Sequence, residues 1–141
     1  MNNNGPVIVV DDDEDDRELL DGVFKNLDLK NEIIFFTDGK KAYDYLVSSD
    51  VTPFLILSDI HMPGLNGPEL CEKIRSNEIL QKLYIPFIYF TTSTTRMAIA
   101  NAYAATADGF FIKPSSYSEI AECIQNIVSY WSACQLPSDY D

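Results

Sequence analysis

Two hydrophobic patterns alternate along the chain, and this alternation limits the possible folds more than any other feature. Short continuous apolar runs are typical of strands buried on both faces, whereas apolar residues three or four positions apart are typical of one helix face. The apolar runs predict strands over residues 7–10, 33–36, 54–57, 86–90 and 110–112. The helical spacing predicts intervening helices that include residues 19–27, 40–47, 70–74, 95–105 and 120–131.

This order of elements predicts a single α/β domain. Parallel strands need crossover connections, and the helices in those crossovers cover both faces of the sheet. We therefore expect a three-layer, doubly wound (βα)5 domain with a parallel sheet over residues 6–134. A tail over residues 1–5 would precede it, and a mobile acidic tail over residues 135–141 would follow it. The hydrophobic share of 46% is sufficient for a packed core.

The charge and cysteine content exclude several classes of protein. The net charge of −12 makes nucleic acids and anionic membranes poor partners, so it indicates either solubility or acids that converge on a cation. Three cysteines, an odd number, and one histidine argue against a disulfide framework and a zinc cluster. The sequence lacks a signal-peptide pattern and an apolar run long enough to span a bilayer, so we expect a cytoplasmic protein.

Polar residues follow the predicted strands at the edge of the sheet where ligands bind in open α/β folds. They are Asp11, Asp12 and Asp13 after the first strand, Asp59 after the third, Thr91 after the fourth and Lys113 after the fifth. Carboxylates that meet at one edge raise one another's pKa unless a cation joins them. A hard divalent cation fits such oxygen ligands, with Mg²⁺ expected and Mn²⁺ as the alternative. Lys113 would neutralise part of the charge or contact an anion.

The chain contains, in this order, the segments VIVVDDDEDDRELL, LILSDIHMPGLNG, FIYFTT and FFIKP. Together they resemble the receiver domains of two-component response regulators, and the resemblance extends over residues 6–131. It implies a flavodoxin-like receiver fold with strand order 2-1-3-4-5. It also implies that the protein is not an enzyme, apart from catalysing its own aspartyl phosphorylation and dephosphorylation.

The resemblance assigns the metal ligands by position. Asp11 and Asp12 would hold Mg²⁺ together with Asp59, and the backbone carbonyl of His61 would be a further ligand. Asp13 lies just beyond the acidic pair, and we expect it to be a solvated loop acid.

The resemblance also assigns the residues that act on the phosphoryl group. Asp59 would accept it as an ionised carboxylate, Thr91 would hydrogen-bond its oxygens and Lys113 would pair with them. His61 and Ser93 lie two residues beyond Asp59 and Thr91, and we expect them to tune the lifetime of the phosphorylated state. The Lys-Pro peptide that follows the fifth strand is commonly cis in the family, so we expect a cis bond before Pro114.

Two departures from the family pattern lie near the fifth strand. Phe110 occupies the position of an aromatic switch residue that works with Thr91, and it lacks the hydroxyl of the more common Tyr. A switch role and a plain core role both stay open for Phe110. Thr106 stands where the family often has Gly, and we expect the turn to be built differently here. The nearby aromatic residues are either core or partner-binding anchors: Tyr103, Tyr117, Tyr130 and Trp131.

The resemblance also implies partners. The phosphoryl donor would be a sensor histidine kinase or a histidine phosphotransfer protein, and an unknown protein would read the signal. No DNA-binding domain follows the last helix, so the chain resembles stand-alone receivers. Its DDRELL and YW segments are similar to the small regulators of phytochrome-type histidine kinases, some of which form homodimers.

Several functions remain open from the sequence. The leading hypothesis is a binding module switched by phosphorylation, and the second is a shuttle that passes phosphate to a histidine phosphotransfer protein. A metal-dependent phosphatase for small phosphate esters and a flavodoxin-like cofactor binder are the alternatives from other classes.

Overall fold

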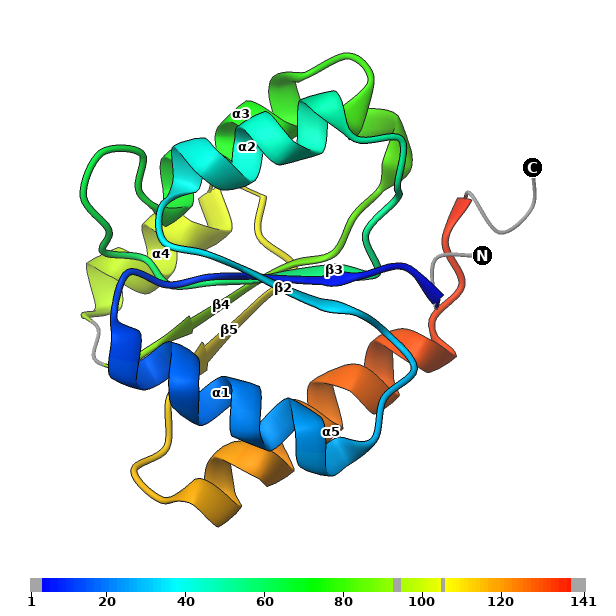
Figure 1. The fold of residues 1–141 in the computed structure, drawn as a ribbon. Helices are drawn as coiled ribbons and strands as arrows, with labels where there is room; N and C mark the ends of the chain where they lie inside the picture. The colour runs from blue at the N-terminus through cyan, green and yellow to red at the C-terminus, as the bar shows by residue number, and fades with distance from the viewer. Residues whose placement is uncertain (1–3, 93–94, 105, 138–141) are drawn as a thin grey trace.

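The computed structural model describes residues 4–92, 95–104 and 106–137, and it contains a five-stranded parallel sheet in the order β2-β1-β3-β4-β5. Helices α1 and α5 cover one face of the sheet, and α2, α3 and α4 lie on the other (Figure 1). The predicted fold class and strand order are therefore confirmed. The strands are β1 (Val7–Val10), β2 (Ile33–Phe36), β3 (Leu55–Ser58), β4 (Phe87–Thr91) and β5 (Gly109–Ile112).

The helices follow the strands as the apolar spacing predicts. They are α1 (Glu14–Leu27), α2 (Gly39–Ser48), α3 (Gly67–Ser76), the 3-10 helix η2 (Leu80–Leu83), α4 (Arg96–Ala104) and α5 (Tyr117–Ala133). Among the described residues, none of these helices is both long and apolar enough to cross a membrane.

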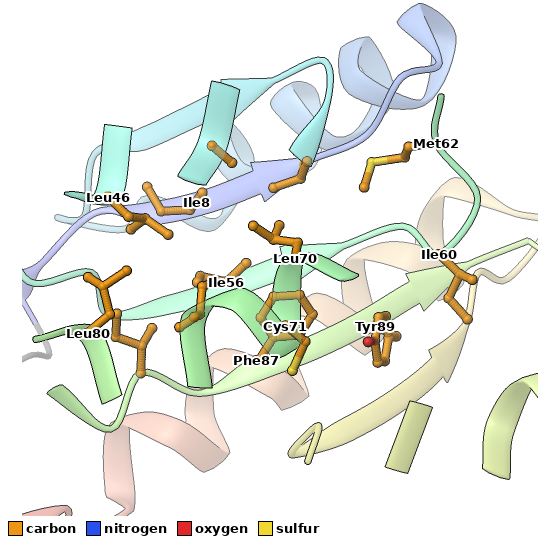
Figure 2. Close-up of a cluster of buried hydrophobic side chains, with 14 of the residues drawn as sticks. Ile8, Leu46, Ile56, Ile60, Met62, Leu70, Cys71, Leu80, Phe87 and Tyr89 are labelled. Atoms are coloured by element: carbon orange, nitrogen blue, oxygen red, sulfur yellow. The ribbon is translucent and has the colours of Figure 1, made fainter. Parts of the chain in front are cut away.

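The core is divided into two layers by the sheet. Successive side chains of a strand point to opposite faces, so Ile8 and Ile56 pack under α2 and α3 while Val9 and Leu57 pack under α1 and α5. Figure 2 shows the first layer, where Leu70 meets the sheet from α3. The three central strands are buried along their whole length, which explains their continuous apolar sequence.

Side-chain caps fix where the helices begin, next to the carboxyl ends of the strands. Asp13, Asp38, Asn66 and Ser116 are the N-caps of α1, α2, α3 and α5, and each accepts a hydrogen bond from the backbone N–H three residues later. Asp13 is exposed as expected, but it also starts α1 rather than lying free in a loop. These caps hold the loops that carry the candidate site.

Thr106 adopts a left-handed backbone conformation with φ +66°, so the expectation of a differently built turn is wrong. The N–H of Thr106 bonds the carbonyl of Tyr103, and the N–H of Ala107 bonds that of Ala102. This pair of bonds is the Schellman motif, in which the residue at the Thr106 position is left-handed and usually Gly. The turn keeps the geometry that favours Gly and places a β-branched residue in it.

We expect Thr106→Gly to be more stable than Thr106→Ala by about 1 kcal/mol. Both variants lack the hydroxyl group, but only alanine keeps the Cβ that a left-handed backbone disfavours. The comparison therefore isolates the backbone strain from the contacts of the threonine side chain. Urea denaturation of the two variants measures the difference, and equal unfolding midpoints would show that the turn carries no strain.

Candidate functional site

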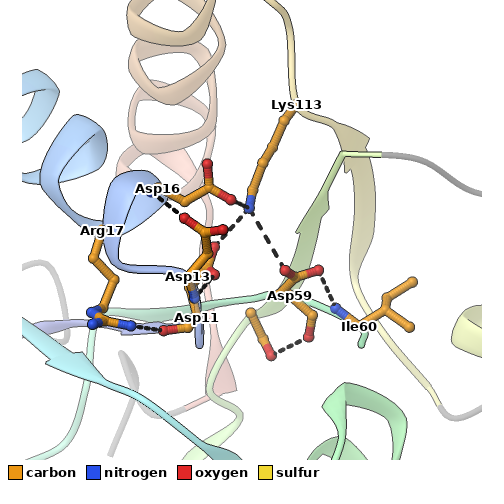
Figure 3. Close-up of polar contacts among 8 residues, drawn as sticks. Asp11, Asp13, Asp16, Arg17, Asp59, Ile60 and Lys113 are labelled. Carbon is orange, nitrogen blue, oxygen red and sulfur yellow. Dashed lines mark hydrogen bonds and ion pairs between the residues drawn. The ribbon is translucent and has the colours of Figure 1, made fainter. Parts of the chain in front are cut away.

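Four polar residues meet where β1, β3, β4 and β5 end. Asp11 and Asp59 directly follow β1 and β3, Thr91 is the last residue of β4 and Lys113 directly follows β5. Backbone hydrogen bonds across the sheet align them: the N–H of Asp59 bonds the carbonyl of Val10 at 2.9 Å, and that of Lys113 bonds the carbonyl of Thr91 at 2.6 Å. The structure thus brings these four residues to one edge, where Figure 3 shows Asp11, Asp59 and Lys113.

Three carboxylates form the centre of this edge. One oxygen from each of Asp11, Asp12 and Asp59 lies within 4.8 Å of the others. Asp11 is buried, Asp59 is partly buried and Asp12 is exposed, so the cluster opens to solvent on one side. Three carboxylate oxygens with an open side fit a hard divalent cation that keeps some of its water ligands. Asp11, Asp12 and Asp59 are the three carboxylates among the metal ligands that the resemblance implies, and the backbone carbonyl of His61 is the fourth expected ligand.

The two oxygens of the Asp59 carboxylate have different neighbours. Its Oδ1 accepts a hydrogen bond from the N–H of Ile60 at 2.7 Å. Its Oδ2 faces the Lys113 ammonium at 3.7 Å, a distance for an ion pair rather than a hydrogen bond. The hydroxyl group of Ser58 donates to the Asp59 carbonyl at 2.8 Å and anchors the backbone there. Oδ2 is therefore the oxygen on the side of the Lys113 ammonium.

Lys113 is the cation of the site, and its side chain is only 6% exposed. Its Nζ lies 2.6 Å from Oδ2 of Asp11 and 2.9 Å from Oδ2 of Asp16, closer than to Asp59. Asp16 is a residue of this site that the sequence did not predict. Its sequence signal is weak, because an acid in the first turn of a helix is also expected from the helix dipole.

Burial and ion pairing act in opposite directions on these groups. Burial raises the pKa of Asp11, although the Lys113 ammonium and the N–H of Asp13 oppose the shift. Burial also acts to lower the pKa of Lys113, but hydrogen bonds to Asp11 and Asp16 outweigh it and the net pKa is raised. Lys113 therefore keeps its positive charge at neutral pH, next to the acids that it partly neutralises.

This arrangement has the elements of a site for phosphoryl groups, and comparison with known proteins decides the family. The family model of the response regulator receiver domain matches residues 7–125. The chain belongs to this family. Receiver domains of response regulators act in two-component signalling, so the predicted resemblance and the predicted class of pathway are confirmed.

Individual relatives support the assignment. This receiver is 30% identical over 112 residues to the probable methanogenesis regulatory protein FilR2 of Methanothrix harundinacea, covering 77% of this chain and 71% of that protein. The crystal structure of the phosphorylated cyanobacterial phytochrome response regulator RcpA matches with a TM-score of 0.83 and 25% identity over 94% of this chain and 97% of that chain. The Mn(2+)-bound form of response regulator Rcp1 matches with a TM-score of 0.77 and 27% identity over 94% and 99%.

The remaining predicted residues of the receiver site have different outcomes. His61 follows the site in the loop after β3, and its side chain is exposed. Ser93 lies outside the described residues. The expectation of a cis bond before Pro114 is wrong, because no described peptide bond is cis. The trans isomer is the more stable one for most bonds to proline, so this outcome needs no special contact.

The aromatic residues near β5 divide into core and surface. Phe110 is half-buried and its ring centroid lies 5.8 Å from that of the buried Tyr89, so it packs in the core while its switch role stays a prediction. Trp131 packs against the core layer that lies under α1 and α5. Tyr103 and Tyr130 are 51% and 64% exposed, which fits the partner-anchor interpretation better than the core interpretation.

Proposed function

We propose that this receiver accepts a phosphoryl group from a sensor histidine kinase onto Asp59 and signals through altered protein contacts. The observation that supports it best is the ion pair between Oδ2 of Asp59 and the buried Lys113 ammonium 3.7 Å away. The carboxylates of Asp11 and Asp12 lie beside this pair. A carboxylate needs no general base to attack phosphorus, so the site requires no separate base beside Asp59.

The proposed transfer uses Oδ2 of Asp59 as the nucleophile. This oxygen forms a bond to phosphorus while the bond between phosphorus and the histidine nitrogen breaks, and the imidazole leaves with a proton from solvent. The hydrogen bond from the N–H of Ile60 to Oδ1 would hold the carboxylate so that Oδ2 faces the phosphoryl donor. Phosphoryl transfer depends mainly on such positioning and on charge stabilisation.

Charge stabilisation would come from the chain and from a cation. The Lys113 ammonium would pair with a phosphoryl oxygen, and the Thr91 hydroxyl would donate a hydrogen bond to another. Asp11, Asp12, Asp59 and the His61 carbonyl would hold Mg²⁺, which supplies positive charge to the transferring oxygens. The three carboxylates that meet at this edge fit that ion.

The proposed signal passes from the site to the surface around α4 and β5. Thr91 and Tyr89 lie on the same face of β4, and Phe110 packs against Tyr89 from β5. Movement of Thr91 toward a phosphoryl group would repack these rings and change the exposed surface around Tyr103. Attack by water on the acyl phosphate would reset the switch, and we expect His61 and Ser93 to tune the rate of that step.

We expect the chain to gain a single phosphoryl group from phosphoramidate, whose nitrogen–phosphorus bond resembles that of phosphohistidine. Intact-protein mass spectrometry measures the adduct with Mg²⁺ and, as a control, with excess chelator. The adduct should form only with Mg²⁺. A chromogenic phosphate ester in the same buffer should not be turned over, and sustained turnover of that ester would favour the phosphatase hypothesis instead.

A further inference from the structure

We propose that Asp16 is a positioning residue that holds the Lys113 ammonium and competes for it with a phosphoryl group on Asp59. The inference rests on the proposed function and adds a means by which the site is regulated. In Figure 3 the ammonium lies between the Asp16 and Asp59 carboxylates. The distance from Nζ to Asp16 is 2.9 Å and that to Asp59 is 3.7 Å, so Asp16 has the closer contact.

The local structure of α1 explains why the Asp16 carboxylate is available for Lys113. Asp16 is the third residue of α1, where an acidic side chain commonly reaches back to the backbone N–H of the N-cap. Glu69 of α3 does so, accepting from the N–H of Asn66 at 3.0 Å. In α1 the N–H of Asp13 instead bonds Oδ1 of Asp11 at 3.0 Å. The Asp11 carboxylate thus accepts the N-cap hydrogen bond that the third helical residue usually accepts, and the Asp16 side chain contacts Lys113 instead.

The position of the ammonium, rather than the number of its donors, makes the two anions rivals. A lysine ammonium has three N–H groups, and Asp11 and Asp16 are the acceptors within hydrogen-bond distance here. A phosphoryl anion on Oδ2 would attract Nζ, which is now 3.7 Å from that oxygen, toward Asp59. That movement lengthens the contact with Asp16. Asp16 also lowers the positive charge that the phosphoryl group would meet.

The surroundings of Asp16 allow this exchange without movement of the backbone. Asp16 and Lys113 both line a cavity of about 180 Å³, and Leu19, Phe90 and Pro114 also line it. The Asp16 side chain is 28% exposed, so it can turn toward solvent when Lys113 leaves. Asp11 is 2% exposed and has no such route, which distinguishes the two carboxylates.

The test compares Asp16→Asn with Asp15→Asn, which removes the same charge from the same helical turn. We measure the affinity of beryllofluoride, an analogue of the phosphoryl group, at saturating Mg²⁺. We expect Asp16→Asn to bind it about fivefold more tightly than Asp15→Asn does. The difference should disappear when each substitution is combined separately with Lys113→Met. Equal affinities, or weaker binding by Asp16→Asn, would overturn the proposal.

A second measurement needs neither metal nor analogue. In metal-free buffer, Asp16→Asn should increase the unfolding equilibrium constant more than Asp15→Asn does, and this excess should also disappear with Lys113→Met. Its persistence there would mean that Asp16 acts on the fold without Lys113. If the unchanged chain fails to bind beryllofluoride, the proposed function fails as well. If it binds and the two aspartate variants behave alike, only the role of Asp16 fails.

Discussion

Replacing Lys113 with methionine should destabilise the folded protein by about 3 kcal/mol at neutral pH. The ammonium is nearly buried and pairs with Asp11, whose side chain is 2% exposed. Methionine fills a similar volume but leaves the carboxylates of Asp11, Asp12 and Asp59 close together without their cation. Urea denaturation measures the loss, and the same substitution at the exposed Lys25, which pairs with Asp21, should cost less than about 1 kcal/mol.

The loss should also depend on pH. Burial already raises the pKa of Asp11 in the folded protein, and removal of Lys113 takes away contacts that lower it. The folded variant then binds a proton more tightly than the unfolded chain does, so its stability rises as the pH falls from neutral toward the ordinary pKa of an aspartate. The deficit relative to the unchanged protein should therefore shrink over this range. A deficit that stays constant would mean that lost packing, rather than unpaired charge, causes it.

Replacing Gly67 with alanine should destabilise the protein by about 3 kcal/mol. A Cβ at Gly67 would clash with the carbonyl oxygen of Asp59 and lie 2.9 Å from Cε1 of Tyr89. The N–H of Gly67 also bonds the carbonyl of Ile60 at 3.0 Å, so α3 cannot move away without breaking this bond. The strain would fall on the backbone of the proposed phosphoacceptor.

The matched control is Gly22→Ala in α1. A Cβ at Gly22 would meet atoms of Tyr117 at 4.0 Å, an ordinary contact. Alanine favours helix over glycine, so this variant should gain about 0.5–1 kcal/mol. The two substitutions add the same methyl group and should change stability in opposite directions. A small or favourable effect of Gly67→Ala would contradict the close approach of α3 to Asp59.

Much of the fold could be predicted because the central strands are continuous apolar runs. The bounds of β1 and β2 match the prediction, whereas β3 and β4 each begin and end one residue later than predicted. Their last residues, Ser58 and Thr91, are polar but buried and paired with neighbouring strands. Hydrophobic pattern alone cannot include such residues, since their burial depends on the site at the end of the sheet.

The convergence of Asp11, Asp59 and Lys113 could also be predicted, because parallel strands bring their carboxyl ends to one edge. The contact between Lys113 and Asp16 could not. It depends on a side-chain direction that the Asp11 contact sets at the start of α1. The left-handed Thr106 was missed for a related reason: the hydrogen bonds that close the end of α4 outweigh the preference of threonine. The conformational preference of a single residue does not show which of several competing hydrogen bonds forms.

The most direct test of the central proposal is the intact mass of the protein after incubation with acetyl phosphate and Mg²⁺. Asp59→Asn is compared with Asp13→Asn, which keeps a good N-cap for α1 and removes an equal charge near the site. We predict that the unchanged protein and Asp13→Asn each gain the mass of one phosphoryl group and that Asp59→Asn gains none. A phosphoryl adduct on Asp59→Asn would contradict the assignment of Asp59 as the acceptor.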